Sequence, residues 1–453
     1  MTDPLIVSVS GLRGVVGTSL TADVAARYAA AFAASLPPGP VVIGRDGRES
    51  GPSLAAAITT TLQAGGRDVI DCGTAATPTV GIVVREHRAA GGIQISASHN
   101  PAKYNGMKLF SGAGRVLPAA AGAEVRRRFE ALASPPLPGR SQGSMRIVDG
   151  TAAHVRLVAA TVDVEAIRRH RPRVWLDSGH GAGSLVARAL FDHLGCDAVI
   201  EGGTPDGRFE HEPEPTAANL AGLLPKIRQQ HAAVGFFQDP DADRLAIATA
   251  DGRYIGEEAT LALAVEHVLA KTPGPIVINC STSMMAARIA ARHGAACHVS
   301  AVGEANVVER MLAERAVLGG EGNGGVIDPR VGFVRDSFSA MALVLDMMCA
   351  GDRLRSVDEL ARGLPQLVMK KTKVDLAPEL SGPALAAVLD RIEGAFAGAR
   401  ADRLDGLRLD WDGGWLLIRG SNTEPIVRIV AEAETEAAVD EAIARATALL
   451  RPQ

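Results

Sequence analysis

The chain has 453 residues, of which 47% are hydrophobic and 22% charged. Its length exceeds what one hydrophobic core normally organises, and its composition excludes a disordered or fibrous protein, so we expect roughly three or four globular domains. The formal net charge of −4 excludes an overall positive field that would recruit nucleic acid or an anionic membrane. The N-terminus has neither a basic lead nor a long apolar core, and the five cysteines lack CxxC spacing, which predicts reduced thiols in a cytoplasmic protein.

A unit of strand, polar turn, helix and second strand occurs three times, at 40–73, 173–202 and 275–303. Each unit predicts a right-handed crossover between parallel strands that are covered on both faces. In each copy a later apolar strand leads into a polar loop, and ligands bind at the carboxyl ends of such strands. We therefore expect three related α/β domains with mixed sheets, whose three loops converge on a central cleft.

The last part of the chain breaks this pattern. It predicts a smaller C-terminal α+β domain, with a helix at 378–398, strands at 407–411, 415–418 and 426–433, and a closing helix at 434–450. The expected domains are 1–146, 147–251, 252–367 and 368–453. We interpret Val368 to Val374 as the last linker, about which the final domain can turn.

The first polar loop follows the apolar run Gly92 to Ile95 and reads SASHNPAKYNGMK up to Lys108. We interpret it as a strand that delivers the Ser98 hydroxyl to an exposed turn. Pro101 and the Asn105-Gly106 pair are expected to form tight turns that return Lys108 towards Ser98. A serine beside a histidine, His99, with a lysine nearby indicates acyl or phosphoryl transfer, although a purely structural turn fits the bare pattern equally well.

The second loop places Asp239, Asp241 and Asp243 at alternate positions after an apolar strand. On one side of an extended loop, these carboxylates offer oxygen ligands to a hard cation. Mg²⁺ keeps room for water or a phosphate oxygen, which suits phosphoryl transfer. The alternative is a capping or turn cluster that holds no metal.

Two further loops are candidate anion sites. The loop from Arg419 to Thr423 offers hydroxyls, an amide and backbone N–H groups to a phosphate, with Arg428 on the strand behind it, although a plain hairpin loop also fits. The glycine-rich turn Gly179 to Ser184, with Glu201 further on, imitates a dinucleotide fingerprint but lacks its full spacing. We favour close strand–helix packing there over NAD binding.

Several motifs occur along the chain in the same order as in the α-D-phosphohexomutases, and through these motifs the chain resembles that family. The family comprises phosphoglucomutase, phosphomannomutase and phosphoglucosamine mutase. The resemblance covers nearly the whole chain. The motifs are SGLRGVVG (10–17), SASHNP (96–101), NGMK (105–108), DPDADR (239–244), GGEGNGG (319–325) and RGSNTEP (419–425).

The resemblance implies four domains around a central cleft, with Ser98 as the phosphoserine. Asp239, Asp241 and Asp243, together with an oxygen of that phosphate, would hold Mg²⁺. Arg244 and Lys108 would position and neutralise the transferring group, and Arg13 would approach the same centre. The implied substrate-binding set is completed by Gly303, Glu321 and Asn323 at the sugar and by Arg419, Ser421, Asn422, Thr423 and Arg428 at the phosphate that is not transferring.

The implied reaction interconverts a hexose 6-phosphate and a hexose 1-phosphate through a bisphosphate intermediate that turns over in the cleft. Within the family the motifs look most like phosphoglucosamine mutase, with phosphomannomutase or phosphoglucomutase as the alternative. The expected partners are a phosphosugar and a hexose bisphosphate, bound to a monomer or homodimer. An NAD-dependent dehydrogenase and an inactive phosphosugar-binding protein remain alternatives from other classes.

Two positions depart from the family pattern. Many members carry GExSGH in the sugar loop, where the histidine is a candidate general base, whereas this chain has Asn323 and Gly325 at the corresponding positions. The proton acceptor therefore stays open between His99, Lys108 and a metal-linked group. At Gly420 the family often has proline, and glycine should loosen the phosphate loop slightly.

Overall fold

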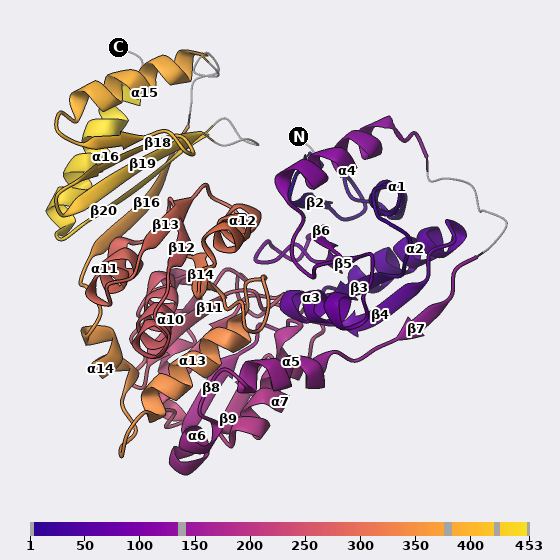
Figure 1. Cartoon of the computed structure of the whole chain (residues 1–453), viewed down its shortest axis with the longest axis horizontal. Helices are drawn as coiled ribbons and strands as arrows, with labels where there is room; N and C mark the ends of the chain where they lie inside the picture. Colours follow the sequence, from indigo (N-terminus) through magenta and orange to yellow (C-terminus); the bar gives the residue numbers. More distant parts are fainter. Residues whose placement is uncertain (1–3, 135–141, 376–382, 421–425, 451–453) are drawn as a thin grey trace.

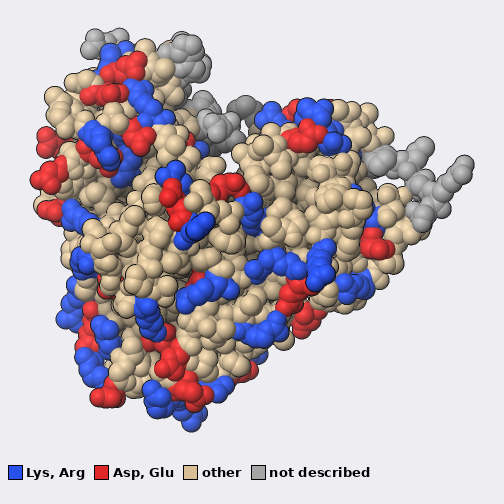
Figure 2. All heavy atoms as spheres, viewed as in Figure 1, with Lys and Arg blue, Asp and Glu red and all other residues tan. Residues whose placement is uncertain are grey.

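The computed structural model describes residues 4–134, 142–375, 383–420 and 426–450. Figure 1 shows four successive domains, with domain I on the right, domains II and III below and to the left, and domain IV at the upper left. Figure 2 shows a notch between domains I and IV, while acidic and basic side chains are scattered in small groups over the rest of the visible face.

Domain I is built on a sheet in the order β1-β2-β6-β5-β3-β4-β7. Its strands are β1 (Ile6–Ser8), β2 (Gly11–Val15), β3 (Val41–Arg45), β4 (Val69–Thr74), β5 (Gly91–Ile95), β6 (Tyr104–Ser111) and β7 (Met145–Ile147). Its helices are α1 (Ala22–Ala33), α2 (Gly51–Ala64), α3 (Thr77–Glu86) and α4 (Ala119–Ala131). β7 pairs with β4 and extends one residue beyond the domain limit expected at residue 146.

Domain II has a sheet in the order β11-β10-β8-β9. Its strands are β8 (Arg173–Asp177), β9 (Asp197–Glu201), β10 (Val234–Gln238) and β11 (Leu245–Thr249). Its helices are α5 (Thr151–Ala159), α6 (Val164–His170), α7 (Gly183–Leu194), α8 (Ala217–Leu220) and α9 (Leu224–Gln229).

Domain III has a sheet in the order β13-β12-β14-β15. Its strands are β12 (Ile276–Asn279), β13 (Cys297–Ser300), β14 (Leu318–Glu321) and β15 (Gly325–Ile327). Its helices are α10 (Glu257–Lys271), α11 (Met284–Arg292), α12 (Glu304–Glu314), α13 (Ser337–Cys349) and α14 (Val357–Arg362).

The three sheets share a four-stranded core of one topology, as the internal repeat predicts. In each sheet the strand before the polar loop lies parallel to the first strand of the repeat, and the strand after the loop returns antiparallel at its side. The strand pairs that flank the three loops are β5 and β6, β10 and β11, and β14 and β15. Each polar loop therefore leaves the carboxyl end of a buried parallel strand, which is where a ligand site is expected.

Domains II and III share a continuous hydrophobic core. This core contains Leu176 and Phe236 from domain II together with Ile278 and Leu318 from domain III. Helix α13 is buried along its entire length and packs against α5, α6 and α7 as well as against α10. Because this packing fixes one domain against the other, the loops after β10 and β14 are held in a defined relation.

Domain IV is an antiparallel sheet in the order β16-β20-β19-β18-β17, covered by two helices. Its elements are β16 (Val368–Asp375), α15 (Pro383–Ala395), β17 (Arg400–Asp402), β18 (Leu407–Trp411), β19 (Gly414–Gly420), β20 (Ile426–Ala433) and α16 (Glu436–Leu450). The interpretation of Val368 to Val374 as a linker was wrong, because β16 pairs with β20 along its whole length. The lysines of β16 gave the segment the composition of a polar linker, although charged side chains are also common on edge strands.

The pair Asn105-Gly106 was also misinterpreted as a turn. Both residues lie inside β6, where Asn105 pairs with Gly14 and Gly106 with Arg13. A Cβ at Gly106 would lie 2.5 Å from the Leu12 carbonyl oxygen, so glycine is needed there for the close approach of two strands.

The five cysteines are all free thiols. Among the described helices we find none that is long and apolar enough to cross a membrane.

Candidate active site

Ser98 lies just beyond the end of β5, which is buried at every position. Its backbone has φ +49°, a left-handed conformation that is uncommon for a residue other than glycine. The Ser98 N–H donates to Ser96 Oγ at 2.8 Å, and Ser98 Oγ donates to Asp239 Oδ2 at 2.7 Å. The hydroxyl from domain I is thus aimed at the acidic loop of domain II.

A buried arginine, Arg48, holds the loop that carries Ser98. Its guanidinium donates to the carbonyl oxygens of Ser98 (2.6 Å), Asn100 (2.6 Å), Pro101 (2.9 Å) and Tyr104 (3.0 Å). Asp46 accepts a hydrogen bond at 3.0 Å from Arg48 and another at 2.7 Å from Ser96 Oγ. This scaffold explains how a strained backbone at Ser98 is maintained.

The three aspartates converge, but not on an extended loop as the alternation predicts. Ala242 has φ +57°, and its N–H donates to the Asp239 carbonyl oxygen, so the segment is a tight turn. Asp239 Oδ1 accepts hydrogen bonds from the backbone N–H groups of Asp243 and Arg244 at 3.1 Å each. One ligand oxygen from each aspartate lies within 4.8 Å of the others, and all three side chains are fully buried.

The donor set fits a divalent cation. Asp241 Oδ1 and Asp243 Oδ1 are buried and have no hydrogen-bond partner among the described residues. A buried carboxylate oxygen without a partner is costly, and a cation bound to the oxygen removes that cost. Three clustered carboxylates with oxygen-only ligands suit Mg²⁺ rather than a metal that prefers nitrogen or sulfur.

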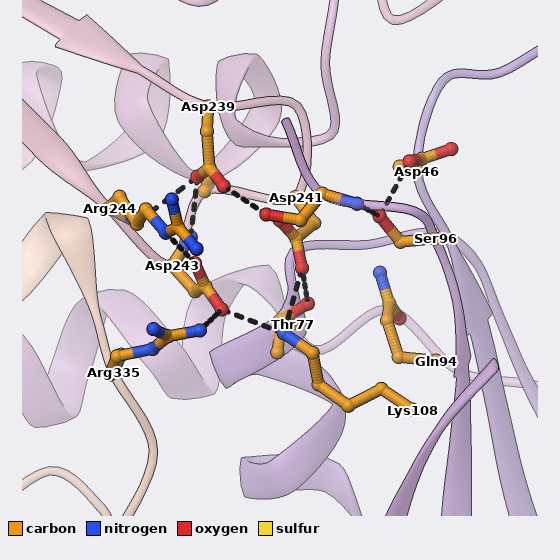
Figure 3. Close-up of polar contacts among 12 residues, drawn as sticks. Asp46, Thr77, Gln94, Ser96, Lys108, Asp239, Asp241, Asp243, Arg244 and Arg335 are labelled. Atoms are coloured by element: carbon orange, nitrogen blue, oxygen red, sulfur yellow. Dashed lines mark hydrogen bonds and ion pairs between the residues drawn. The ribbon is translucent and has the colours of Figure 1, made fainter. Parts of the chain in front are cut away.

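Cationic side chains from three domains surround this acidic turn, as Figure 3 shows. Lys108 Nζ, on β6, lies 3.1 Å from Asp241 Oδ2 and 2.7 Å from Asp243 Oδ2. Arg335, from domain III, donates to Asp243 Oδ2 at 2.6 Å, and Arg244 Nε lies 3.7 Å from Asp243 Oδ1. The site therefore combines clustered carboxylates with clustered cations, which is an arrangement suited to holding phosphate and a divalent cation together.

These charges shift the pKa values of the carboxyl groups in opposite directions. Burial, and after it the charges of Asp241 and Asp243, raises the pKa of Asp239. Burial alone would also raise the pKa of Asp243, but Arg335, Lys108 and Arg244 lower it below its usual value. Burial opposes the charge on Lys108, yet Asp241 and Asp243 outweigh it and raise the lysine pKa, so this side chain stays protonated.

His99 and Arg13 flank the same centre. His99 Nδ1 lies 3.3 Å from Ser98 Oγ, and its Nε2 lies 4.0 Å from Glu214 Oε1. Burial, together with Arg244 and Arg13, lowers the pKa of His99 to about 3, so the imidazole is neutral. Burial and Arg244 also lower the pKa of Arg13, which places Arg13 in the electrostatic field of the site.

The loop after β14 presents Glu321 and Asn323. Glu321 is 4% exposed; its Oε1 accepts hydrogen bonds from Asn279 Nδ2 (2.8 Å) and Gly303 N–H (3.1 Å), and its Oε2 accepts one from Arg335 (2.5 Å). Burial would raise the pKa of Glu321, but Arg335 and these hydrogen bonds lower it, so the carboxylate is ionised. Asn323 Oδ1 is buried without a partner among the described side chains.

The predicted phosphate loop is described at its two edges only. Arg419 and Arg428 face each other on β19 and β20, while Ser421, Asn422 and Thr423 lie outside the described residues. Asp405 Oδ1 accepts a hydrogen bond from Arg419 Nε at 2.7 Å, and Asp405 Oδ2 accepts one from the Val302 N–H at 3.0 Å. Asp405 therefore connects the arginine of domain IV to the segment next to Gly303 in domain III.

The residues absent from the sequence prediction are those whose role depends on contacts between distant segments. They are Asp46, Arg48, Thr77, Asn279, Glu304, Arg335 and Asp405. Thr77 is typical: it begins α3 and its Oγ1 donates to Asp241 Oδ2 at 2.5 Å. Of this set Asp46 and Arg48 lay in the polar turn of the first repeat, and Asn279 ended the first strand of the third repeat. We had interpreted these segments only as a turn and a strand.

The glycine-rich turn that imitates a dinucleotide site is closely packed, as we favoured. A Cβ at Gly183 would lie 2.3 Å from Gln238 Oε1, and one at Gly181 would lie 2.4 Å from the Pro240 carbonyl oxygen. The turn lies directly against the start of the aspartate loop, and this contact accounts for its glycines.

Comparison with known proteins agrees with this architecture. Successive stretches of the chain match the four domains of the phosphoglucomutase/phosphomannomutase family: domain I at residues 5–135, domain II at 152–252, domain III at 257–368 and the C-terminal domain at 378–449. A phosphoglucomutase/phosphomannomutase of Thermococcus kodakarensis is 35% identical over 434 residues, which cover 94% of each chain.

Other relatives give the same picture. A probable phosphoglucosamine mutase of Methanopyrus kandleri is 32% identical over 431 residues, which cover 94% of this chain and 93% of that protein. The crystal structure of a phosphoglucomutase/phosphomannomutase family protein from Burkholderia thailandensis has a TM-score of 0.85 at 28% identity and covers 98% of both chains. The chain therefore belongs to the phosphoglucomutase/phosphomannomutase family of phosphohexomutases.

Proposed function

We propose that this protein interconverts hexose 6-phosphates and hexose 1-phosphates through a phosphoryl group carried on Ser98, and that glucosamine phosphate is its substrate. The observation that carries the proposal is the placement of the Ser98 hydroxyl, 2.7 Å from Asp239 in a buried acidic triad that is itself surrounded by Lys108, Arg244 and Arg335. Phosphoryl transfer depends mainly on positioning and charge neutralisation, and this arrangement supplies both.

In the proposed reaction a sugar hydroxyl attacks the phosphorus of phospho-Ser98. The bond from phosphorus to Ser98 Oγ breaks, a new bond to the sugar oxygen forms, and the product is a hexose bisphosphate. The bisphosphate turns over in the cleft, Ser98 Oγ attacks its other phosphoryl group, and the hexose monophosphate leaves. The net reaction moves the phosphate between two positions of one sugar and restores phospho-Ser98.

Each residue around Ser98 has a proposed part in this transfer. Arg48 and the Ser96 hydroxyl hold the loop, so that the serine oxygen keeps one orientation. Lys108 and Arg244 donate to the transferring phosphoryl group and balance its charge. His99, whose neutral ring lies 3.3 Å from Ser98 Oγ, orients this oxygen, and the proton of the attacking sugar hydroxyl passes to the Ser98 oxygen as it leaves. Arg13 contributes positive charge from β2.

We propose Mg²⁺ as the cofactor, with Asp239, Asp241 and Asp243 as its protein ligands and a phosphoryl oxygen on Ser98 as a further ligand. The two buried carboxylate oxygens without partners support this assignment. When bound, the cation would neutralise the charge of the phosphoryl group and help to orient it. Removal of divalent cations by a chelator should therefore abolish turnover, and added Mg²⁺ should restore it.

The loop after β14 would bind the sugar. Ionised Glu321 accepts hydrogen bonds from sugar hydroxyls or pairs with the ammonium group of glucosamine, and Asn323 Oδ1 offers a second buried acceptor. Gly303 supports Glu321 through its N–H, while Arg419 and Arg428, with Ser421, Asn422 and Thr423, would bind the phosphate that is not transferring. The name of the Methanopyrus relative supports glucosamine, whereas that of the Thermococcus relative keeps glucose and mannose as the alternatives.

The test is ³¹P NMR of the purified protein with Mg²⁺ and a trace of hexose bisphosphate, supplied separately with glucosamine, glucose and mannose 6-phosphates. We expect a 1-phosphate resonance to appear fastest with glucosamine 6-phosphate. Faster conversion of glucose or mannose 6-phosphate would refute the glucosamine assignment and leave the mutase reaction intact. Conversion of none of the three would refute the mutase reaction and favour a protein that binds phosphosugars without turnover.

A further inference from the structure

Arg335 is a buried arginine at the boundary between domains II and III that interacts with three carboxylates. Its side chain donates to Asp243 Oδ2 at 2.6 Å and to Glu321 Oε2 at 2.5 Å, and its Nε lies 3.4 Å from Glu304 Oε2. Its backbone N–H donates to the other oxygen of Glu304 at 2.9 Å. Arg335 is 7% exposed, and none of the three acids is more than 8% exposed, so these charges interact with little screening by water.

The sugar loop makes room for this arginine. A Cβ placed on Gly325 would lie 2.3 Å from Arg335 Cδ and 3.0 Å from its Cγ. Gly325 is the position at which the histidine of the GExSGH pattern would stand. In this chain the aliphatic stem of Arg335 fills the space beside that position, and its guanidinium extends from there to Glu321 and Asp243.

The backbone of Arg335 is held by the shared core of domains II and III. The next residue, Asp336, caps α13 by accepting a hydrogen bond from the Phe338 N–H at 2.9 Å, and it also pairs with buried His154 of α5 at 3.0 Å. Arg335 therefore extends from a rigid helix start. Its planar guanidinium binds Glu321 and Asp243 through two separate nitrogens, whereas a lysine would offer both carboxylates a single nitrogen.

We propose that Arg335 is a positioning residue that couples the cation site of domain II to the sugar-reading carboxylates of domain III. It orients Asp243 by binding Oδ2 and leaving Oδ1 without a hydrogen bond among the described residues, and it orients Glu321 by binding Oε2. The sugar half of this proposal rests on the proposed function, whereas the cation half does not. The charge state of Glu321 thereby influences Asp243, because both acids share one guanidinium.

The coupling has a direction that can be measured. When Glu321→Gln removes one of the carboxylates that balance Arg335, more of the arginine's positive charge acts on Asp243. A cation at Asp243 then meets stronger repulsion, so its affinity falls. When Arg335 is replaced by methionine, Glu321 has no guanidinium through which to act, and the same Glu321→Gln change has little effect on the cation.

The experiment measures Mn²⁺ binding by electron paramagnetic resonance, using the full chain with unphosphorylated Ser98 and no sugar. The variants are wild type, Glu321→Gln, Arg335→Met and the double variant. We expect Glu321→Gln to weaken Mn²⁺ binding by roughly fivefold or more in the wild type, the lower end of coupling between linked sites, and by less than about twofold in Arg335→Met. An equal loss in both backgrounds, or no loss in the wild type, would overturn the proposal.

If Arg335→Met does not fold, Arg335→Gln replaces it in the same cycle. Glutamine keeps a polar side chain but carries no charge, so the effect of Glu321→Gln should again shrink to less than about twofold. Persistence of the full effect with glutamine would contradict coupling through the guanidinium.

The sugar half is tested by steady-state kinetics with the hexose phosphate that the protein converts best. Arg335→Lys should raise its KM by roughly tenfold, since the loss of a charge-assisted hydrogen bond to Glu321 misorients the acceptor. Arg330→Lys is the matched control, because Arg330 pairs with Asp328 in the same segment and its side chain is 41% exposed. An unchanged KM in Arg335→Lys would overturn this half. If wild type converts no hexose phosphate, the proposed function fails while the Mn²⁺ cycle still decides the cation half.

Discussion

Arg48→Lys tests whether the loop that carries Ser98 is held in place by one buried guanidinium. The guanidinium of wild-type Arg48 donates five hydrogen bonds, four of them to carbonyl oxygens between Ser98 and Tyr104. An ammonium group has three N–H donors, so at least two of the five acceptors lose their donor. At about 1.5 kcal/mol for each charge-assisted bond, the loss is about 3 kcal/mol.

We expect most of this loss to appear in catalysis. The loop can open to water locally instead of unfolding domain I, so the unfolding midpoint should change little. If the misplaced serine oxygen costs the full 3 kcal/mol in the transition state, kcat/KM falls roughly 100-fold. The assay is steady-state conversion of the hexose phosphate, together with thermal unfolding of the same samples.

Arg45→Lys is the control, because Arg45 lies on the same strand and donates to Thr74 Oγ1, on β4, at 2.6 Å. Its kcat/KM should stay within about twofold of the wild type, because Arg45 does not hold the Ser98 loop. A kcat/KM for Arg48→Lys equal to that of Arg45→Lys would refute the argument that these carbonyl contacts position Ser98.

Three further predictions concern Asp405, Gly325 and Glu258. Asp405→Asn replaces one of the two carboxylate oxygens that accept hydrogen bonds from Arg419 and from Val302 of domain III. Arg419 is then held less firmly, so the KM for hexose phosphate should rise about tenfold in steady-state kinetics while kcat changes little. Gly325→Ala should lower the unfolding midpoint, since its Cβ would lie 2.3 Å from Arg335 Cδ, and thermal unfolding measures the loss. Burial raises the pKa of Glu258 to about 7, above its unfolded value, so the folded state binds the extra proton and the stability of wild type should fall as pH rises from about 5 to about 8. This fall amounts to at most about 3 kcal/mol, and Glu258→Gln should remove it when unfolding is followed across that pH range.

Each of these predictions has a result that would contradict it. An unchanged KM for Asp405→Asn would mean that Arg419 does not depend on that carboxylate. Unaltered thermal stability of Gly325→Ala would show that the Arg335 stem moves aside freely. For Glu258, the same pH dependence in wild type and in the glutamine variant would show that another group titrates over this range.

The sequence was most informative where function follows from local order along the chain. The three repeats predict three sheets of one topology, and the polar loops after β5, β10 and β14 do lie at equivalent strand ends. Alternating aspartates predict convergence of their carboxylates, although the turn at Ala242 that produces it was not foreseen. These features are short-range, so periodicity and spacing carry them.

The sequence was least informative where one side chain joins distant segments. Arg335 follows no motif, and its contacts with Asp243 and Glu321 exist only because α13 lies in a core shared by two domains. Arg48 is separated from Ser98 by fifty residues of sequence. Single buried arginines leave no periodic signal, so the three-dimensional fold is needed to find them.

The central claim is that Ser98 carries the phosphoryl group that the sugar receives. The most direct measurement is mass spectrometry of the peptide that contains Ser98, before and after the purified protein meets glucosamine 6-phosphate with Mg²⁺. The account predicts phosphorylation at Ser98, its loss when excess sugar phosphate is added, and simultaneous appearance of hexose bisphosphate. Conversion of sugar phosphate by protein in which Ser98 is replaced by alanine, at a rate near that of the wild type, would contradict it.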